Sequence, residues 1–149
     1  MYYDARRPAA VARIFGGPEA PELAGQVRFF REPDGVLVVA DLVGLPSPSG
    51  FFALHIHEGM SCAGAGFEQT GSHFNPNAAP HPDHAGDLPP LLSSGGKAYL
   101  AVRTNRFGLP DILGRTVVIH SRPDDFRTQP AGNAGTKIAC GVIREVTSK

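Results

Sequence analysis

Glycine and proline interrupt this chain of 149 residues along its whole length. The 18 glycines and 14 prolines are spread so widely that the longest run free of both is Lys97–Phe107. Proline breaks the interior of an α-helix and glycine weakens it, so a helical protein needs several longer uninterrupted runs. The sequence therefore excludes an all-α fold and favours short β-strands joined by turns.

The composition excludes several further classes of protein. The 14 basic and 14 acidic side chains cancel, which argues against a nucleic-acid partner. With 42% hydrophobic and 19% charged residues, the chain can form the core of a single domain, which we expect to span residues 1–149. No apolar run approaches membrane-spanning length, so no membrane partner is expected. The start, Met1–Arg7, lacks the basic-then-apolar order of a signal peptide, which predicts a cytoplasmic protein, or an extracytoplasmic one if a leader was removed.

Seven segments have β character and lie between turn signals such as Pro33–Gly35 and Ser93–Gly96. They are Ala9–Phe15, Leu23–Arg31, Val36–Val43, Phe51–His57, Lys97–Thr104, Thr116–His120 and Ile138–Val146. Short strands at this spacing predict an antiparallel sandwich or barrel. Two connections, from about Glu58 to Pro90 and from Ser121 to about Thr136, are too long for hairpins, and loops of this length are usually functional.

The six histidines all lie between positions 55 and 120. His55 and His57 alternate within a β-type run, so both project from one face of the strand while Leu54 and Ile56 face the core. His120 ends another strand-like run, on its outward side. Imidazoles paired on one strand face form half of a metal site, although two surface histidines would give the same pattern.

The first long loop adds His73, His81, His84 and Asp87 within fifteen residues. Three nitrogens and one oxygen suit tetrahedral Zn²⁺, whereas an all-histidine set suits tetragonal Cu²⁺. Asp83 competes with Asp87 as the carboxylate ligand, and a polar surface loop without metal would have a similar composition. Seven candidate ligands for two four-coordinate sites require one shared ligand, and a shared imidazole must lose its second ring proton.

Blocks of sequence in a fixed order carry a resemblance to a known family. They are His55-Ile56-His57-Glu58, Gly71–Pro76, His84–Leu88, Gly114–His120, Asp124-Asp125 and Gly132–Ile143. From about Phe51 to Ile143 the chain resembles the Cu,Zn superoxide dismutases. The resemblance implies an all-β, eight-stranded Greek-key barrel or sandwich with two long functional loops, in one Cu,Zn superoxide dismutase-like domain.

The resemblance also implies a ligand set for each metal. Copper, alternating between Cu²⁺ and Cu⁺, would be bound by His55, His57, His73 and His120. Zn²⁺ would be bound by His73, His81, His84 and Asp87. His73 is then the shared imidazolate, and the resemblance implies that it takes up and returns a proton during turnover.

The implied activity is the dismutation of two superoxide ions, the small-molecule substrate, to dioxygen and hydrogen peroxide. Asp124 would link a copper histidine to a zinc histidine, and Cys62 and Cys140 would form an intrachain disulfide. Lys137 would attract the anion at the copper site. Family members pair in different ways, so a homodimer is one expected state of the chain.

The chain departs from the family in four places without losing a metal ligand. Lys137 replaces the usual arginine and lacks its planar fork. The loop Ser121–Thr136 is shorter than in the animal enzymes, His81 and His84 are only three residues apart, and Ala53 replaces a usual glycine. The alternative is a non-enzymatic metal-binding member of the same fold. A metal-dependent hydrolase would need an open zinc position and a general base, and neither is evident.

Overall fold

The computed structural model describes residues 6–147. The expectation that no signal peptide is present rests partly on residues 1–5, which lie outside the described part of the chain, as do the last two residues of the predicted domain. The elements in chain order are β1 (Ala10–Gly16), β2 (Ala24–Glu32), β3 (Gly35–Val43), β4 (Phe51–Phe52), β5 (Leu54–His57), the 3₁₀ turn η1 (Glu68–Thr70), β6 (Leu91–Leu92), β7 (Ala98–Thr104), α1 (Leu109–Ile112), β8 (Thr116–His120) and β9 (Lys137–Glu145).

Six of the seven predicted strands are confirmed to within one residue at each end. The seventh, Phe51–His57, is divided into β4 and β5 by Ala53. The Ala53 amide donates to the carbonyl of Arg122 at 3.0 Å, and its carbonyl accepts from the amide of His120 at 2.9 Å. The run therefore stays extended but changes partners at Ala53. The short elements β6, η1 and α1 were not predicted from the sequence.

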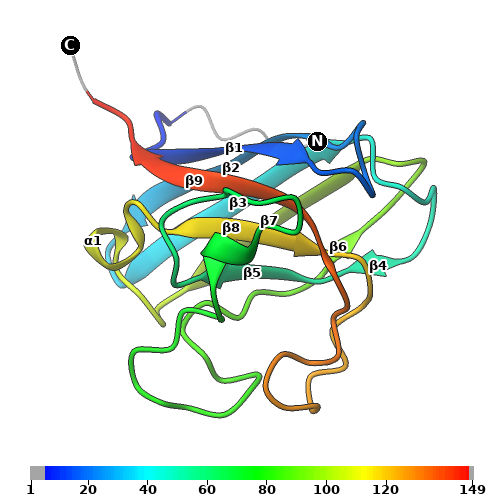
Figure 1. The fold of residues 1–149 in the computed structure, drawn as a ribbon. Coiled ribbons are helices and arrows are strands. Elements are labelled where there is room, and N and C mark those ends of the chain that lie inside the picture. Colours follow the sequence, from blue (N-terminus) through cyan, green and yellow to red (C-terminus); the bar gives the residue numbers. More distant parts are fainter. Residues whose placement is uncertain (1–5, 148–149) are drawn as a thin grey trace.

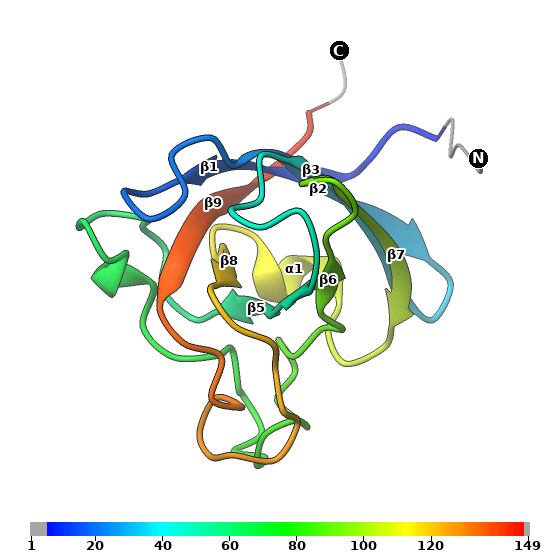
Figure 2. The same ribbon diagram turned by 90° about the vertical axis from the view of Figure 1, so that its right-hand side faces the viewer.

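The strands form a curled antiparallel sheet, and the all-β fold class is confirmed. Seven strands follow the order β5-β8-β9-β1-β2-β3-β7, and β4 pairs separately with β6. Because β4 leads directly into β5 and β6 precedes β7, the small pair lies between the two edges of the curled sheet, as the end-on view shows (Figure 2). If β4 and β5 are counted as one strand, there are eight, as predicted. The non-sequential neighbours β5 and β8 give the sheet its Greek-key character.

Alternation along the strands puts one apolar face inside the curl. In the β5–β8 ladder, Leu54 lies opposite Ile119 and Ile56 opposite Val117, and all four belong to the main core cluster. His55 and His57 therefore project from the other face of β5, as predicted. Both imidazoles are nevertheless buried, because the two long loops cover this face of the sheet.

The two long loops lie side by side at one end of the molecule, below β5 and β8 in Figure 1, and the end-on view agrees (Figure 2). The first loop is attached to β9 by the disulfide Cys62–Cys140, which confirms the predicted pairing. Among residues 6–147, no helix has the length and apolar character needed to cross a membrane.

Candidate metal centre

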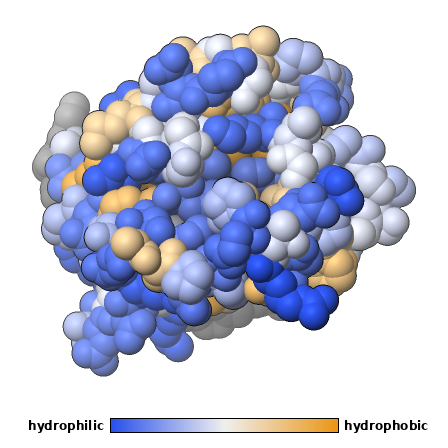
Figure 3. All heavy atoms as spheres, turned by 60° about the horizontal axis from the view of Figure 1, so that its bottom comes forward, coloured by the Kyte–Doolittle hydropathy of each residue, from blue (hydrophilic) through white to orange (hydrophobic). Residues whose placement is uncertain are grey.

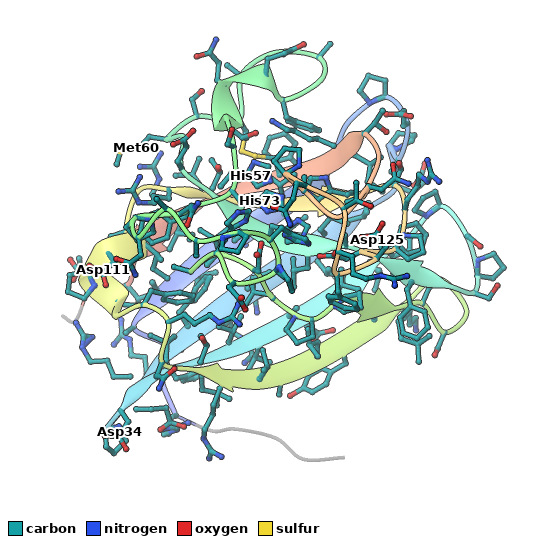
Figure 4. The ribbon with its side chains drawn as sticks, turned by 90° about the horizontal axis from the view of Figure 1, so that it is seen from below. Asp34, His57, Met60, His73, Asp111 and Asp125 are labelled. Carbon is teal, nitrogen blue, oxygen red and sulfur yellow. A yellow bond between two sulfur atoms is a disulfide. The ribbon has the colours of Figure 1, made fainter. Side chains whose placement is uncertain are left out.

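Four buried imidazoles meet where β5, β8 and the first loop converge. They belong to His55, His57, His73 and His120, and their candidate ligand atoms lie within 4.8 Å of one another. The loop residue His73 is held beside the sheet by a β-bridge to His57, and the view from below shows the two side by side (Figure 4). The ring of His73 lies over that of His55, with centroids 3.9 Å apart.

On two of the strand histidines, His55 and His57, one ring nitrogen donates a hydrogen bond, so the other ring nitrogen carries a lone pair. Nδ1 of His57 donates to the carbonyl of Gly71 at 2.9 Å, so its Nε2 carries the lone pair. Nε2 of His55 donates to Asp124 at 2.8 Å, so its Nδ1 carries the lone pair. Nδ1 of His55 and Nε2 of His73 are buried without a hydrogen-bond partner, and Nε2 of His57 faces Nε2 of His120 at 3.2 Å. Buried nitrogens without partners are costly, and a bound cation would satisfy them.

A second group of donors surrounds the opposite nitrogen of His73. Its Nδ1 lies 2.9 Å from Oδ1 of Asp87 and 3.2 Å from Nδ1 of His84. Nδ1 of His81 and Nδ1 of His84 each lie 3.1 Å from Oδ2 of Asp87. In a zinc tetrahedron with bonds near 2.0 Å, neighbouring ligand atoms are about 3.3 Å apart. The donors therefore already have nearly the spacing that a zinc ion requires.

Candidate ligand atoms of His55, His73, His81 and Asp87, one from each, also lie within 4.8 Å of one another, so that His55 competes with the predicted His84. We favour His84, because its Nδ1 is within 3.2 Å of both His73 and Asp87, whereas His55 already belongs to the first group and its Nε2 is occupied by Asp124. Asp83, the competing carboxylate, has a side chain that is 66% exposed and paired with Arg106 at 3.4 Å. The structure thus brings Asp87 into the cluster and leaves Asp83 outside it.

Asp124 connects the two groups of ligands. One carboxylate oxygen accepts from His55 at 2.8 Å and the other from His81 at 2.7 Å, and the carboxylate is almost completely buried. Gly132 lies against this bridge with φ +73°, and a Cβ atom there would meet the Asp124 carboxylate at 2.0 Å. Any side chain at position 132 would displace the bridge, which explains the glycine.

The electrostatics keep the rings of His55, His57 and His120 neutral and the carboxylates of Asp87 and Asp124 charged, which is the protonation state that metal binding needs. Burial lowers the pKa of His57 to about 2 and that of His120 to about 3, and burial also lowers the pKa of His55. Burial alone would raise the pKa of Asp124, but the hydrogen bonds from His55 and His81 outweigh it and hold the pKa well below its usual range. Burial would likewise raise the pKa of Asp87, but the hydrogen bond from His73 and the electrostatic interactions with the neighbouring histidines together outweigh burial, so the pKa is lowered.

Two loop residues that the sequence did not single out hold the second group in place. The carboxamide of Gln129 accepts from the His81 amide at 2.9 Å and donates to the His81 carbonyl at 2.8 Å. Arg106 donates to the carbonyls of Pro82 at 2.7 Å and His84 at 3.2 Å. No periodicity or spacing marks either residue, because both act across long sequence separations.

A hollow of about 520 Å³ opens onto the first group of histidines and is lined by His57, His73, His120 and Lys137, among others. Mainly hydrophilic side chains cover the loop end of the molecule (Figure 3). Burial lowers the pKa of Lys137, and the charge of Glu68 opposes this shift. A larger hollow, of about 620 Å³, lies at the β2–β3 turn and contains no histidine. The first group of histidines is therefore open to solvent through the hollow that Lys137 lines.

Known proteins are similar to this chain in sequence and in fold. Residues 23–143 match the family described as copper/zinc superoxide dismutase (SODC). The chain is 38% identical to the Cu-Zn superoxide dismutase 2 of Aquifex aeolicus over 138 residues, which is 83% of this chain and 80% of that protein. It is 38% identical to the Cu-Zn superoxide dismutase of Legionella pneumophila over 137 residues, 86% of this chain and 82% of the relative.

Solved structures agree with these relatives. The clock protein EA4 superposes with a TM-score of 0.80 and 30% identity, covering 98% of this chain and 100% of that chain. A SOD-like protein from Bacillus subtilis superposes with a TM-score of 0.77 and 28% identity, covering 89% of this chain and 96% of that one. With the family match extending over most of its length, this chain belongs to the copper/zinc superoxide dismutase family.

Proposed function

We propose that this protein is a superoxide dismutase with a copper and a zinc ion joined through His73. The proposal rests above all on one observation, that both ring nitrogens of His73 face a separate group of buried donors. The proposed copper ligands are His55, His57, His73 and His120. The proposed zinc ligands are His73, His81, His84 and Asp87.

The metals and the chain have separate tasks in this proposal. When bound, copper supplies the one-electron chemistry that oxidises one superoxide to dioxygen and reduces a second to peroxide, while zinc supplies a fixed positive charge beside His73. Nε2 of His73 takes up a proton in one half of the cycle and returns it in the other. Lys137 attracts the superoxide anion into the hollow, and Asp124 orients His55 and His81.

The test is an assay of superoxide removal by protein loaded with both metals, beside the variant His120→Ala. We expect fast removal with one copper and one zinc per chain, and collapse of the activity in the variant. Asn105→Ala, an exposed position, is the matched control and should behave as the unmodified protein. Full copper occupancy with activity no better than free copper would contradict the proposal and would instead support a non-enzymatic, metal-binding role.

Pairing of two chains and the cellular compartment stay predictions from the sequence. The mass of the metal-loaded protein in solution, measured by light scattering, distinguishes a homodimer from a single chain. Four zinc ligands, as proposed, would leave no open position on zinc, which argues against the hydrolase alternative.

A further inference from the structure

The hydroxyl of Thr70 is buried behind the hollow, with the residue 0% exposed, and it contacts Lys137, which lines the hollow. It lies at the end of η1 and donates its one proton to the carbonyl of Phe67 at 2.8 Å. Because that proton is already used, the oxygen can only accept a second hydrogen bond. It accepts this bond from Nζ of Lys137 at 2.7 Å. The direction of both hydrogen bonds is therefore fixed.

The turn that carries Thr70 is itself well anchored. Phe67 is buried, and its ring packs edge-to-face against Phe15 with centroids 5.9 Å apart. The disulfide Cys62–Cys140 attaches the same segment to β9, three residues from Lys137. Thr70 thus offers Lys137 an acceptor whose position does not depend on the flexible lysine side chain.

Lys137 needs such an acceptor more than an arginine would. A lysine carries a point charge on a flexible stem, whereas an arginine presents a planar set of donors. One N–H of Lys137 goes to Thr70 and a second to the carbonyl of Gly71 at 2.9 Å, which leaves the third for a ligand in the hollow. The carboxylate of Glu68, on the same turn, attracts the ammonium in competition.

We propose that Thr70 is a positioning residue whose hydroxyl holds the Lys137 ammonium at the mouth of the hollow, so that the remaining N–H binds a small anion approaching the copper ligands. The inference rests on the proposed function for the identity of that anion, superoxide. By fixing the Lys137 ammonium, Thr70 makes up in part for the rigid, planar guanidinium that an arginine at position 137 would have.

The test uses azide, a small anion that binds copper, and follows its affinity through the visible spectrum of the copper-loaded protein. Thr70→Val keeps the shape of the side chain but removes the acceptor. We expect it to weaken azide binding about tenfold, as for the loss of one hydrogen bond to a charged group. Thr70→Ser keeps the hydroxyl and should restore azide binding to within about twofold of the unmodified protein.

A double-mutant cycle with Lys137→Met separates positioning from general damage. If Thr70 acts through Lys137, Thr70→Val should have no further effect on azide affinity in the Lys137→Met background. An equal effect in both backgrounds, or unchanged azide affinity in Thr70→Val alone, would overturn the inference. If Thr70→Val does not retain its metals, Thr70→Ala takes its place in the cycle, with the same expected outcomes.

The salt dependence of superoxide removal provides an independent readout. Thr70→Val retains the positive charge, so its rate should still fall with ionic strength, whereas Lys137→Met should lose most of that dependence. A Thr70→Val protein that loses the salt dependence as Lys137→Met does would contradict a positioning role. If the unmodified protein binds copper and azide but does not remove superoxide, the proposed function fails, and the azide cycle still decides the role of Thr70.

Discussion

Replacing Asp124 with alanine removes the carboxylate that connects the two groups of ligands. His55 and His81 would each lose one charge-assisted hydrogen bond, of 2.8 and 2.7 Å. Such a bond contributes about 1.5–3 kcal/mol. The backbones of the two histidines are held by different contacts, however, so the affinities for the two metals should not fall equally.

His55 belongs to β5, where the ladder to β8 fixes its backbone and the surrounding side chains bury its ring completely. His81 lies in no strand, and the carboxamide of Gln129 rather than a ladder holds its backbone. Both rings are fully buried, so the difference lies in the backbone, which is held less firmly at His81 than at His55 once Asp124 is gone. We therefore expect zinc affinity to fall about 10–100-fold and copper affinity to fall by less than about tenfold.

Competition with a chelator of known affinity at neutral pH measures both metals separately. Asp83→Ala is the matched control, because it removes a carboxylate from the same region that contacts Arg106 and no ligand ring. The control should leave zinc affinity unchanged. Unchanged zinc binding in Asp124→Ala, or an equal loss of both metals, would refute the reasoning that strand and loop hold their ligands differently.

Three further predictions follow from the described contacts. Reduction of Cys62–Cys140, whose partners are 78 residues apart, should lower the free energy of unfolding by about 4 kcal/mol, as measured by urea denaturation with and without reductant. In the metal-free protein, pKa values of about 2 for His57 and about 3 for His120 mean that the unfolded state binds more protons below pH 6.5. Stability should then fall as the pH is lowered, by about 2 kcal/mol per histidine between pH 7.5 and 5, and equal urea midpoints at the two pH values would contradict this. Gln129→Ala should weaken zinc binding about tenfold and leave copper binding unchanged in the same chelator assay.

Local sequence was sufficient to predict most of the strands and the common face of two histidines, for physical reasons. Turn residues set the strand ends, and two-residue alternation placed His55 and His57 on one face. It was not sufficient to show that the run Phe51–His57 changes partners at Ala53. That break depends on the carbonyl of Arg122, which is 69 residues away in the chain.

The choice between Asp83 and Asp87 was another point that spacing left open. The backbone of Asp87 forms a β-bridge with His55, and its Oδ2 accepts from the His84 amide at 3.0 Å. Contact with the sheet therefore decides which carboxylate turns inward. The sequence did not predict the roles of Thr70, Gln129 and Arg106 for the same reason. Each is a polar residue whose partner is distant in the sequence and is brought near only by the fold.

The two groups of ligands thus rest on different parts of the fold. The first takes three histidines from the strand ends of β5 and β8, whereas the second takes its ligands from a loop held by contacts such as Gln129 and Arg106. His73 belongs to both, but its backbone is bridged to His57 and so is supported by the sheet. Loosening the loops should consequently disperse His81 and His84 while His73 stays beside the strand histidines. For this reason, the copper ligands should remain assembled under conditions in which zinc has already been lost.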